Sequence, residues 1–167
     1  NTVAICNYLN ISSSDKVITT LPMSYSYGLS IINTHLFSNS SLILTNLSFA
    51  QRSMWDKIKK YKVTTFGGVP YTFELLRKLK FSRLNISSFN YITQAGGKLD
   101  LNTLKYFTKV CKEKKIKFFV MYGQTEASPR MSFLSPELIE AKAGSIGTPI
   151  QDGKFSLLKH KKDEEGE

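Results

Sequence analysis

The sequence predicts an α/β fold in which a mostly parallel sheet carries helices on both faces. Short apolar and β-branched segments alternate with amphipathic segments of about ten residues, which is typical of βαβ units. The crossovers of such units place the strands parallel and cover both faces of the sheet. The 167 residues are also enough for one domain with a buried core.

The first βαβ unit is predicted near the start of the chain. Residues 16–21 form a β-branched run after a turn-like Ser-Ser-Ser-Asp stretch, which predicts a strand. Residues 28–37 predict a helix, and a second apolar run at residues 41–45 predicts the next strand. The apolar positions expected on one face of this helix are Leu29, Ile32 and Leu36.

The next helix is predicted to begin at Ser48. Gln51 follows three residues later, which is the spacing of a capping box. The apolar side chains at helical spacing in this segment are Met54, Trp55 and Ile58. Residues 63–66 then predict a third strand, which ends at a Gly-Gly-Val-Pro stretch at residues 67–70.

Two further helix predictions and two strand predictions follow. Residues 71–79 predict a helix, and residues 90–93 predict a short strand. Asp100 is expected to N-cap the next helix, because its carboxylate can accept from free backbone N–H groups. The side chains expected to face inward on these two helices are Phe73, Leu76, Leu79, Leu101, Leu104, Phe107 and Cys111. A fifth strand, residues 118–121, ends at Tyr122.

The character of the chain changes after the fifth strand. Residues 143–149 form a connector rich in turn-forming residues, and residues 154–158 predict another short strand. We therefore expect a central α/β subdomain at residues 1–142. The connector and the start of a β-rich subdomain are expected at residues 143–167.

Lysines account for much of the formal net charge of +10. They cluster at residues 57–62 and 105–117, on predicted helices whose other faces are apolar. No aromatic residues alternate with these lysines in the pattern typical of nucleic-acid-binding surfaces. We therefore expect solvated helix faces rather than a surface that binds nucleic acid. The apolar runs are short and interrupted, so no membrane span is expected.

The two cysteines, Cys6 and Cys111, lie far apart in segments of helical character. Two buried, reduced thiols in a cytoplasmic protein are the expected state, with a disulfide as the alternative. His35 lies on a predicted helix and His160 in a charged tail. Both are expected to be structural or solvated rather than catalytic.

Residues 122–126, Tyr-Gly-Gln-Thr-Glu, contain an aromatic ring, a glycine, a hydroxyl and a carboxylate directly after a predicted buried strand. An aromatic ring can stack on a base, a glycine lets backbone approach a ligand, and a carboxylate can bind magnesium. Other predicted strands also end in small or turn-forming residues, at 67–70 and 95–97. Parallel strands bring such ends to one edge, where ligands bind in open α/β sheets. The sequence therefore predicts a nucleotide polyphosphate site at this edge.

Five motifs occur in an order that resembles the core of the adenylate-forming superfamily, which includes acyl-CoA synthetases, peptide-synthetase adenylation domains and firefly luciferase. They are residues 21–28, 67–70, 96–99, 122–126 and 144–149. The resemblance implies the flavodoxin-like subdomain of that fold. It also implies a two-step reaction, in which a carboxylate attacks the α-phosphorus of ATP and a thiol then displaces AMP from the acyl-adenylate.

The resemblance implies particular roles around the nucleotide. Tyr122 would flank the adenine ring, and Thr125 would hydrogen-bond the α-phosphate. Glu126 would ligate the Mg²⁺ that bridges the phosphates of ATP, so Thr125 and Glu126 are the expected catalytic residues. The other residues expected around the adenylate are Ala95, Gly96, Gly97, Lys98, Gly123 and Gln124.

The resemblance also implies where the other substrates bind. A small-molecule carboxylate is expected in a pocket lined by Tyr25, Gly28, Val69 and Pro70, and the thiol would belong to CoA or to the phosphopantetheine of a carrier protein. Many family members have a histidine where this chain has Tyr25, so the role of that histidine does not transfer. The substrate carboxylate is the nucleophile, so the reaction needs no Ser-His-Asp or Cys-His set, and none is evident in the sequence.

Several parts of such an enzyme are missing from this sequence, namely the Ser/Thr/Gly-rich phosphate loop, the ribose-binding Asp and the Lys of the mobile C-terminal domain. We therefore expect a central fragment of a ligase, which by itself binds ATP weakly and has no measurable turnover. Two other functions stay open: a non-catalytic, flavodoxin-like nucleotide- or acyl-binding module, and a basic nucleic-acid-binding domain. Arg130 is expected at the surface, with contact to an anionic substrate as the alternative.

Overall fold

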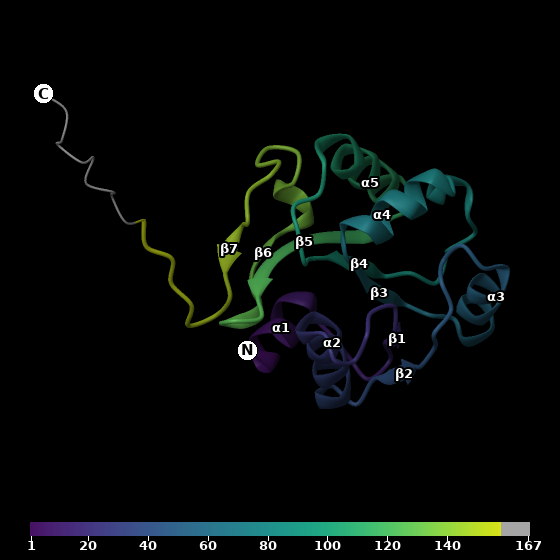
Figure 1. Cartoon of the computed structure of the whole chain (residues 1–167), viewed down its shortest axis with the longest axis horizontal. Coiled ribbons are helices and arrows are strands. Elements are labelled where there is room, and N and C mark those ends of the chain that lie inside the picture. Colours follow the sequence, from purple (N-terminus) through teal and green to yellow (C-terminus); the bar gives the residue numbers. More distant parts are fainter. Residues whose placement is uncertain (158–167) are drawn as a thin grey trace, which may run out of the picture.

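A computed structural model describes residues 1–157, and residues 158–167 lie outside the described part (Figure 1). It contains a seven-stranded sheet in the order β2-β1-β3-β4-β5-β6-β7. The strands are β1 (Lys16–Ile18), β2 (Ser41–Ile43), β3 (Thr65–Gly68), β4 (Tyr91–Gln94), β5 (Lys117–Gln124), β6 (Ser128–Leu134) and β7 (Thr148–Pro149). The helices are α1 (Thr2–Leu9), α2 (Ser26–Phe37), α3 (Arg52–Tyr61), α4 (Pro70–Lys78) and α5 (Leu101–Glu113), with 3₁₀ turns η1 (Phe81–Arg83) and η2 (Pro136–Leu138).

Helices cover both faces of this sheet, with α1 and α2 on one face and α4 and α5 on the other (Figure 1). The side chains of the strands alternate between the two cores. Ile92 and Phe118 pack beneath α4 and α5, whereas Tyr91 and Phe119 pack beneath α1 and α2. Strands β1 to β5 pair in parallel, and β6 and β7 are antiparallel. The predicted α/β class with a mostly parallel sheet is confirmed.

Several local predictions are confirmed as well. Asp100 caps α5, since its Oδ1 accepts from the backbone N–H groups of Asn102 and Thr103 at 3.0 Å each. Cys6 and Cys111 are buried free thiols. In the described part of the chain, no helix is both long and apolar enough to cross a bilayer.

The predicted start of α3 is wrong by about one turn. Ser48 and Gln51 do interact, because the Ser48 amide donates to Gln51 Oε1 at 2.7 Å. That contact closes a separate turn, since Gln51 is extended (φ −92°, ψ 132°) and the helix begins at Arg52. The third strand also differs from the prediction, because it continues through Gly67 and Gly68 rather than ending before them.

Helix α2 buries the face opposite to the predicted one. Leu29 and Leu36 are 47% and 58% exposed, and Ile32 is half-buried. The residues that α2 buries are Tyr27, Gly28, Ser30, Ile31, Thr34 and His35. Leu79 and Leu101 are also exposed, because they stand just after the end of α4 and at the first position of α5.

The β5–β6 hairpin is the largest feature that the sequence did not predict. Strand β5 continues past Tyr122 to Gln124, and the chain then returns antiparallel as β6. The buried side chains of β6 are Arg130, Ser132 and Leu134. Since only one of these three is apolar, β6 lacks the hydrophobic alternation that signals a strand.

The end of the described part differs from the prediction in two ways. Strand β7 forms within the predicted connector and pairs with β6. Residues 154–157 form no strand, and Leu157 is fully exposed without a neighbouring strand among the described residues. Leu158, which belongs to the strand predicted there, and His160 lie outside the described residues. The division into subdomains after residue 142 stays a prediction.

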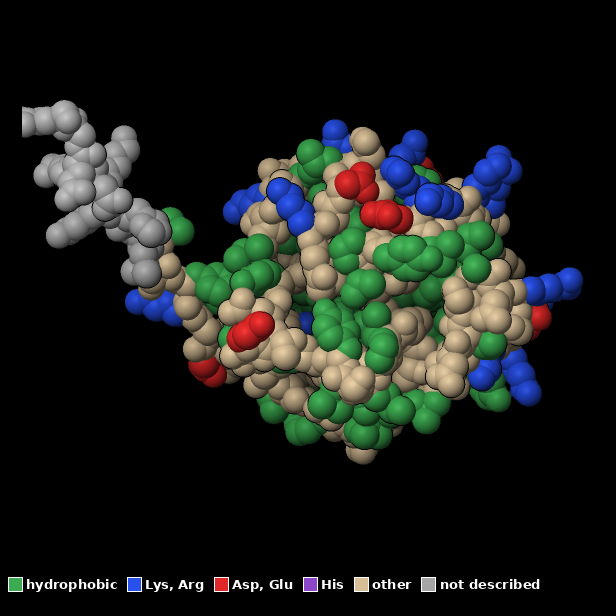
Figure 2. Space-filling model, in the orientation of Figure 1, with side chains coloured by type: hydrophobic (Ala, Val, Ile, Leu, Met, Phe, Trp, Pro, Cys, Tyr) green, Lys and Arg blue, Asp and Glu red, His purple; other side chains and the backbone are tan. Residues whose placement is uncertain are grey.

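On the face that Figure 2 shows, basic side chains are spread out rather than gathered in one place. Figure 2 shows Lys and Arg at separate positions around the visible face, among acidic and apolar side chains. One of the lysines, Lys112, pairs with Glu140 at 3.8 Å. This distribution is typical of solvated helix faces.

Candidate functional site

The carboxyl edge of the sheet brings most of the predicted motifs together. The loop after β4, the N-terminal end of α2 and the β5–β6 hairpin meet there and enclose a small pocket of about 30 Å³. Its lining residues are Tyr25, Ser26, Tyr27, Ala95, Gly96, Gly123, Gln124, Thr125, Pro129 and Arg130. Segments that lie far apart in the sequence therefore share one site.

The turn after β4 contacts both the α2 loop and the loop after β3. Gly96 and Gly97 have φ values of +78° and +151°, which favour glycine. A Cβ at Gly96 would lie 2.6 Å from the Tyr25 hydroxyl oxygen and 3.0 Å from Val69 Cγ1. A Cβ at Gly97 would lie 3.1 Å from Pro70 Cγ. The residues expected along the nucleotide therefore border those expected along the acid.

Gln94 holds this turn and was not among the expected site residues. Its side chain is 1% exposed, and Nε2 donates to the carbonyl oxygens of Gly97 at 2.8 Å and Ala95 at 3.3 Å. These bonds fix the backbone that would face the nucleotide. The sequence signal that marks it is an amide side chain directly before the Ala-Gly-Gly turn.

Several of the expected residues do not line the small pocket, namely Gly28, Val69, Pro70, Gly97, Lys98, Tyr122 and Glu126. Gly28 is buried in the first turn of α2, where an added Cβ would clash with the carbonyl of Pro22. Its lack of a side chain therefore serves close packing of α2 against the preceding loop. Lys98 is exposed, and its Cε lies 3.9 Å from the position of a Cβ built on Gly144.

The hairpin shapes the Tyr-Gly-Gln-Thr-Glu motif. Tyr122 is 36% exposed, and its hydroxyl lies 3.5 Å from Gln124 Oε1. The pairing of the strands is irregular between Tyr122 and Gln124, and an added Cβ at Gly123 would clash with the backbone nitrogen of Arg130. Gly123 is therefore required by the approach of the neighbouring strand.

Thr125 and Glu126 lie at the exposed tip of this hairpin. Thr125 Oγ1 is 2.9 Å from Ser26 Oγ at the start of α2, a contact for which the sequence carries no signal. Glu126 makes no ion pair within the described residues, where no group of three acidic, His or Cys side chains converges. A single free carboxylate fits Mg²⁺, which usually takes its other ligands from substrate phosphates and water.

Arg130 is buried, so the expectation of a surface arginine is wrong. Its side chain is 1% exposed and lies between β6 and α2. Nε donates to Ser30 Oγ at 2.9 Å, and Nη2 donates to Ser30 O at 2.6 Å and to Thr34 Oγ1 at 3.1 Å. Burial lowers the pKa of Arg130, and its guanidinium lies 5.9 Å from the centroid of the Tyr27 ring.

Buried polar side chains support the floor of the site. Tyr27 Oη lies 2.8 Å from Thr93 Oγ1, and burial raises the pKa of Tyr27 to about 12. His35 Nδ1 donates to the Ile31 carbonyl at 2.8 Å, and Nε2 accepts from the Tyr91 hydroxyl at 3.1 Å. Burial lowers the pKa of His35 to about 4, so it is neutral near pH 7 and structural, as expected.

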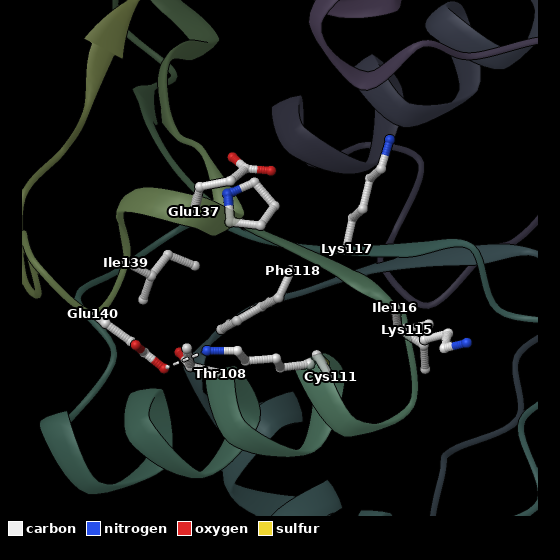
Figure 3. Close-up of a pocket in the computed structure, with 11 residues that line it drawn as sticks. Thr108, Cys111, Lys115, Ile116, Lys117, Phe118, Glu137, Ile139 and Glu140 are labelled. Carbon is white, nitrogen blue, oxygen red and sulfur yellow. Dashed lines mark ion pairs between the residues drawn. The ribbon is translucent and has the colours of Figure 1, made fainter.

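Larger hollows also lie outside the small pocket. One, of about 360 Å³, adjoins the ends of β1 and β2 and is lined by residues 19–23 and 44–47. Another, of about 350 Å³, is lined by Lys16, residues 41–44, Lys57 and Tyr61. A further one, of about 330 Å³, lies between α5, the amino end of β5 and η2 (Figure 3). Its lysines diverge, since Lys115 and Lys117 extend away from one another (Figure 3). Burial also raises the pKa of Cys111 to about 12, so its thiol is protonated at neutral pH.

Sequence comparisons connect this chain with CoA ligases. The sequence model of the family described as AMP-binding enzyme matches residues 1–167. Indoleacetate–CoA ligase from Aromatoleum aromaticum is 23% identical over 148 residues, which cover 88% of this chain and 28% of that protein. 2-Succinylbenzoate–CoA ligase from Bacillus subtilis is 28% identical over 142 residues, which cover 85% of this chain and 28% of that protein. The chain therefore spans 28% of the length of each of these relatives.

Solved structures share the fold. O-succinylbenzoate CoA synthetase from Bacillus subtilis in complex with ATP and magnesium ion matches with a TM-score of 0.76 and 26% identity, over 90% of this chain and 30% of that one. The N-terminal domain of FACL13 from Mycobacterium tuberculosis matches with a TM-score of 0.78 over 90% of this chain and 37% of that one. At 22% identity, that second match supports the fold alone. Since the family match extends over the whole sequence, the chain belongs to the AMP-binding enzyme family.

Proposed function

We propose that the protein containing this chain is an AMP-forming acid–thiol ligase, which activates a carboxylate as an acyl-adenylate and passes the acyl group to a thiol. The arrangement at the carboxyl edge of the sheet is the observation that carries this proposal. Gly96, Tyr25 and Thr125 line one small pocket there. The membership of the chain in the AMP-binding enzyme family and the named CoA ligases among its relatives support the same reaction.

In the proposed first step, the hairpin and the turn after β4 hold the two reactants in line. Thr125 donates a hydrogen bond to the α-phosphate, and the backbone of Ala95, Gly96 and Gly97 lies along the nucleotide. Tyr122, whose ring is partly exposed, flanks the adenine. Catalysis then comes from positioning and charge stabilisation, because the carboxylate of the acid is itself the nucleophile.

Glu126 is the residue proposed to hold the magnesium ion. When bound, the ion neutralises phosphate charge and so favours the loss of pyrophosphate. Glu126 suits this task because its carboxylate is exposed at the hairpin tip and unpaired within the described residues. B. subtilis o-succinylbenzoate CoA synthetase, a solved relative at 26% identity, has been solved in complex with ATP and magnesium ion.

The acid is proposed to bind beside Tyr25, Val69 and Pro70, all of which contact the Gly96–Gly97 turn. In the second step a thiol attacks the acyl carbon, and AMP leaves with the electron pair of the broken acyl–phosphate bond. CoA is the proposed thiol because the two curated relatives are named as CoA ligases. The phosphopantetheine of a carrier protein is the alternative acceptor.

The chain by itself is proposed to bind ATP weakly and to lack turnover, since it corresponds to 28% of the length of its curated relatives. We also propose a cytoplasmic location, because both cysteines are free thiols. The acid is not carried over from the relatives, since indoleacetate and 2-succinylbenzoate are named for different proteins.

The test is carboxylate-dependent ATP–pyrophosphate exchange by the full-length protein and its Glu126→Gln and Glu126→Ala variants. We expect both variants to lose exchange by about a hundred- to a thousandfold, because a charge that stabilises the phosphates is removed. Glu140→Ala is the matched control, since Glu140 pairs with Lys112 at the opposite edge of the sheet. Unchanged exchange in the Glu126 variants would exclude the metal role. ATP binding without exchange for any acid would favour a non-catalytic module.

A further inference from the structure

Helix α2 turns an apolar face away from the rest of the described chain. Leu29, Ile32 and Leu36 lie at helical spacing on this face, where the two leucines are exposed and Ile32 is half-buried. Phe37, at the end of the helix, is 60% exposed, and the remaining residue of the face, Asn33, is uncharged. We call these five residues the α2 apolar face. A helix that faces water normally carries charged and polar side chains on that side. The outer side of α2 therefore has the composition of a buried surface.

The charged residues of the chain avoid this side of the sheet. The sequences of α1 and α2, which cover it together, contain no Asp, Glu, Lys or Arg. Only Asp15 and Lys16 are charged among the first 50 residues, and they cancel, so residues 51–167 carry the whole net charge of +10. Figure 2 shows apolar side chains along its lower edge, where α2 lies, and several lysines and arginines along its upper edge, where α4 and α5 lie. The two faces of the sheet thus differ in charge, as expected if one faces water and the other a partner.

The opposite face of α2 is held in place, so the helix cannot turn to bury its apolar side. Ser30 and Thr34 accept hydrogen bonds from Arg130, and His35 contacts the Tyr91 hydroxyl. A rotation of the helix would leave these buried polar groups, a guanidinium among them, without partners, which is costly. The α2 apolar face can therefore be covered only from outside the described part of the chain.

We propose that the α2 apolar face packs against an apolar helix from a part of the same polypeptide that lies outside residues 1–167. The chain spans 28% of the length of each of its two curated relatives, so most of a protein of that length lies outside this region. A segment tethered to the chain has a high effective concentration at the face, an advantage that a separate molecule lacks. The absence of charge fits a permanent contact, since such interfaces resemble a protein core cut in half. The proposal does not depend on the ligase function.

The pattern of the face favours a helix as the partner element and argues against a membrane. Leu29, Ile32 and Leu36 stand at positions i, i+3 and i+7, and such rows form the ridges with which one helix packs against another. Helices that lie on a membrane surface carry Lys and Arg beside their apolar face. Neither α1 nor α2 contains a basic residue of that kind. A protein helix therefore fits this face better than a lipid surface does.

The test measures how fast a maleimide modifies one introduced cysteine in the full-length protein, with each site identified by peptide mass spectrometry. Leu36→Cys probes the α2 apolar face, and Lys109→Cys on the exposed side of α5 is the matched control. Each rate is divided by the rate of the same cysteine in urea-unfolded protein. We expect a reduction of about a hundredfold or more for Leu36→Cys and of less than about tenfold for Lys109→Cys, because a covered thiol reacts only when the contact opens. Reaction of Leu36→Cys as fast as in unfolded protein would show a free face and reject the proposal.

A charge at the same position identifies the occupant of the face. Leu36→Lys is expected to lower the melting temperature of the full-length protein by about 5 °C or more, since it places an unpaired charge inside a contact. Lys109→Ala should change it little. The molar mass from light scattering should be the same for Leu36→Lys and the wild type, because the contact lies within one polypeptide. A smaller mass for Leu36→Lys would assign the face to a second copy, and an unchanged melting temperature would show that nothing covers it; either result rejects the proposal. If Leu36→Lys does not fold, the labelling of Leu36→Cys decides.

Discussion

Gly123 shows at the scale of a single residue why the Tyr-Gly-Gln-Thr-Glu motif contains a glycine. The motif by itself indicates close approach of backbone to a ligand. In the structure the close approach is to the backbone nitrogen of Arg130, across the irregular pairing of β5 with β6. The glycine thus shapes the strand pair that carries Thr125, and any effect of Gly123 on a bound nucleotide would be indirect.

Gly123→Ala is expected to lower the free energy of unfolding of the chain by about 2 kcal/mol or more, because the new Cβ forces the two strands apart. Gly144→Ala is the matched comparison. Gly144 has φ +86°, but the nearest atom to an added Cβ is 3.9 Å away, so only backbone strain of about 1 kcal/mol is expected. Urea unfolding of both variants decides this, and an equal loss in the two would contradict the steric argument.

His35 makes the stability of the chain depend on pH. Its pKa is about 4 in the folded chain and about 6.5 when unfolded, so the unfolded state binds the proton first as pH falls. The contribution is fully present above about pH 6.5 and is lost between there and about pH 4. Between about pH 7.5 and about pH 5, we expect the free energy of unfolding to fall by about 2 kcal/mol from this group.

Urea unfolding of the wild type and of His35→Gln at both pH values isolates that contribution. Carboxylates that titrate in the same range affect both proteins alike. The difference between the two proteins in how the free energy of unfolding changes with pH is therefore due to His35. We expect a shallower slope in His35→Gln, even if the variant is less stable at every pH because it loses the bond to Tyr91. Identical slopes would show that His35 is not buried in its neutral form.

At the scale of elements, α2 and β6 account for two prediction errors that have one cause. The buried face of α2 carries Ser30, Thr34 and His35, and the buried face of β6 carries Arg130 and Ser132. Hydrophobic periodicity therefore predicts the wrong face for α2 and no strand at β6. The two polar faces meet at Arg130, which donates to Ser30 and Thr34. Neither sequence pattern contains that information by itself.

Helix α5 shows the opposite case, in which a local signal is sufficient. Asp100 was predicted as its cap, and both expected bonds are present. Asp100→Ala is expected to lower the free energy of unfolding by about 1 kcal/mol, because the first-turn N–H groups lose their acceptor. Asp100→Asn should retain most of the stability, since an amide oxygen also accepts. Thermal unfolding of both variants tests this, and an equal loss in the two would contradict the capping role.

At the scale of the whole molecule, the order of elements up to β5 and the edge where the predicted motifs meet could be predicted, because both follow from βαβ alternation. The partners of the site residues could not. Ser26 and Thr125 are 99 positions apart, and Ser30 and Arg130 are 100 apart. Gln94 supports the Gly96–Gly97 turn from inside the sheet. Such contacts depend on the register of a strand that the sequence does not reveal.

The two glycines in β3 affect how the site can change through mutation. A Cβ at Gly67 would lie 2.5 Å from Ile31 Cδ1 and 2.8 Å from the Tyr27 hydroxyl, and a Cβ at Gly68 would lie 2.9 Å from Thr72. Gly67 therefore faces α2 and Gly68 faces α4, so a larger residue at either position would have to displace side chains of the helix above it. If the acid binds where we propose, a change of preferred acid would be expected to arise in the walls, at Tyr25 or Val69. Selection for a new substrate would then act on few positions, and both border the Gly96–Gly97 turn that is proposed to lie along the nucleotide.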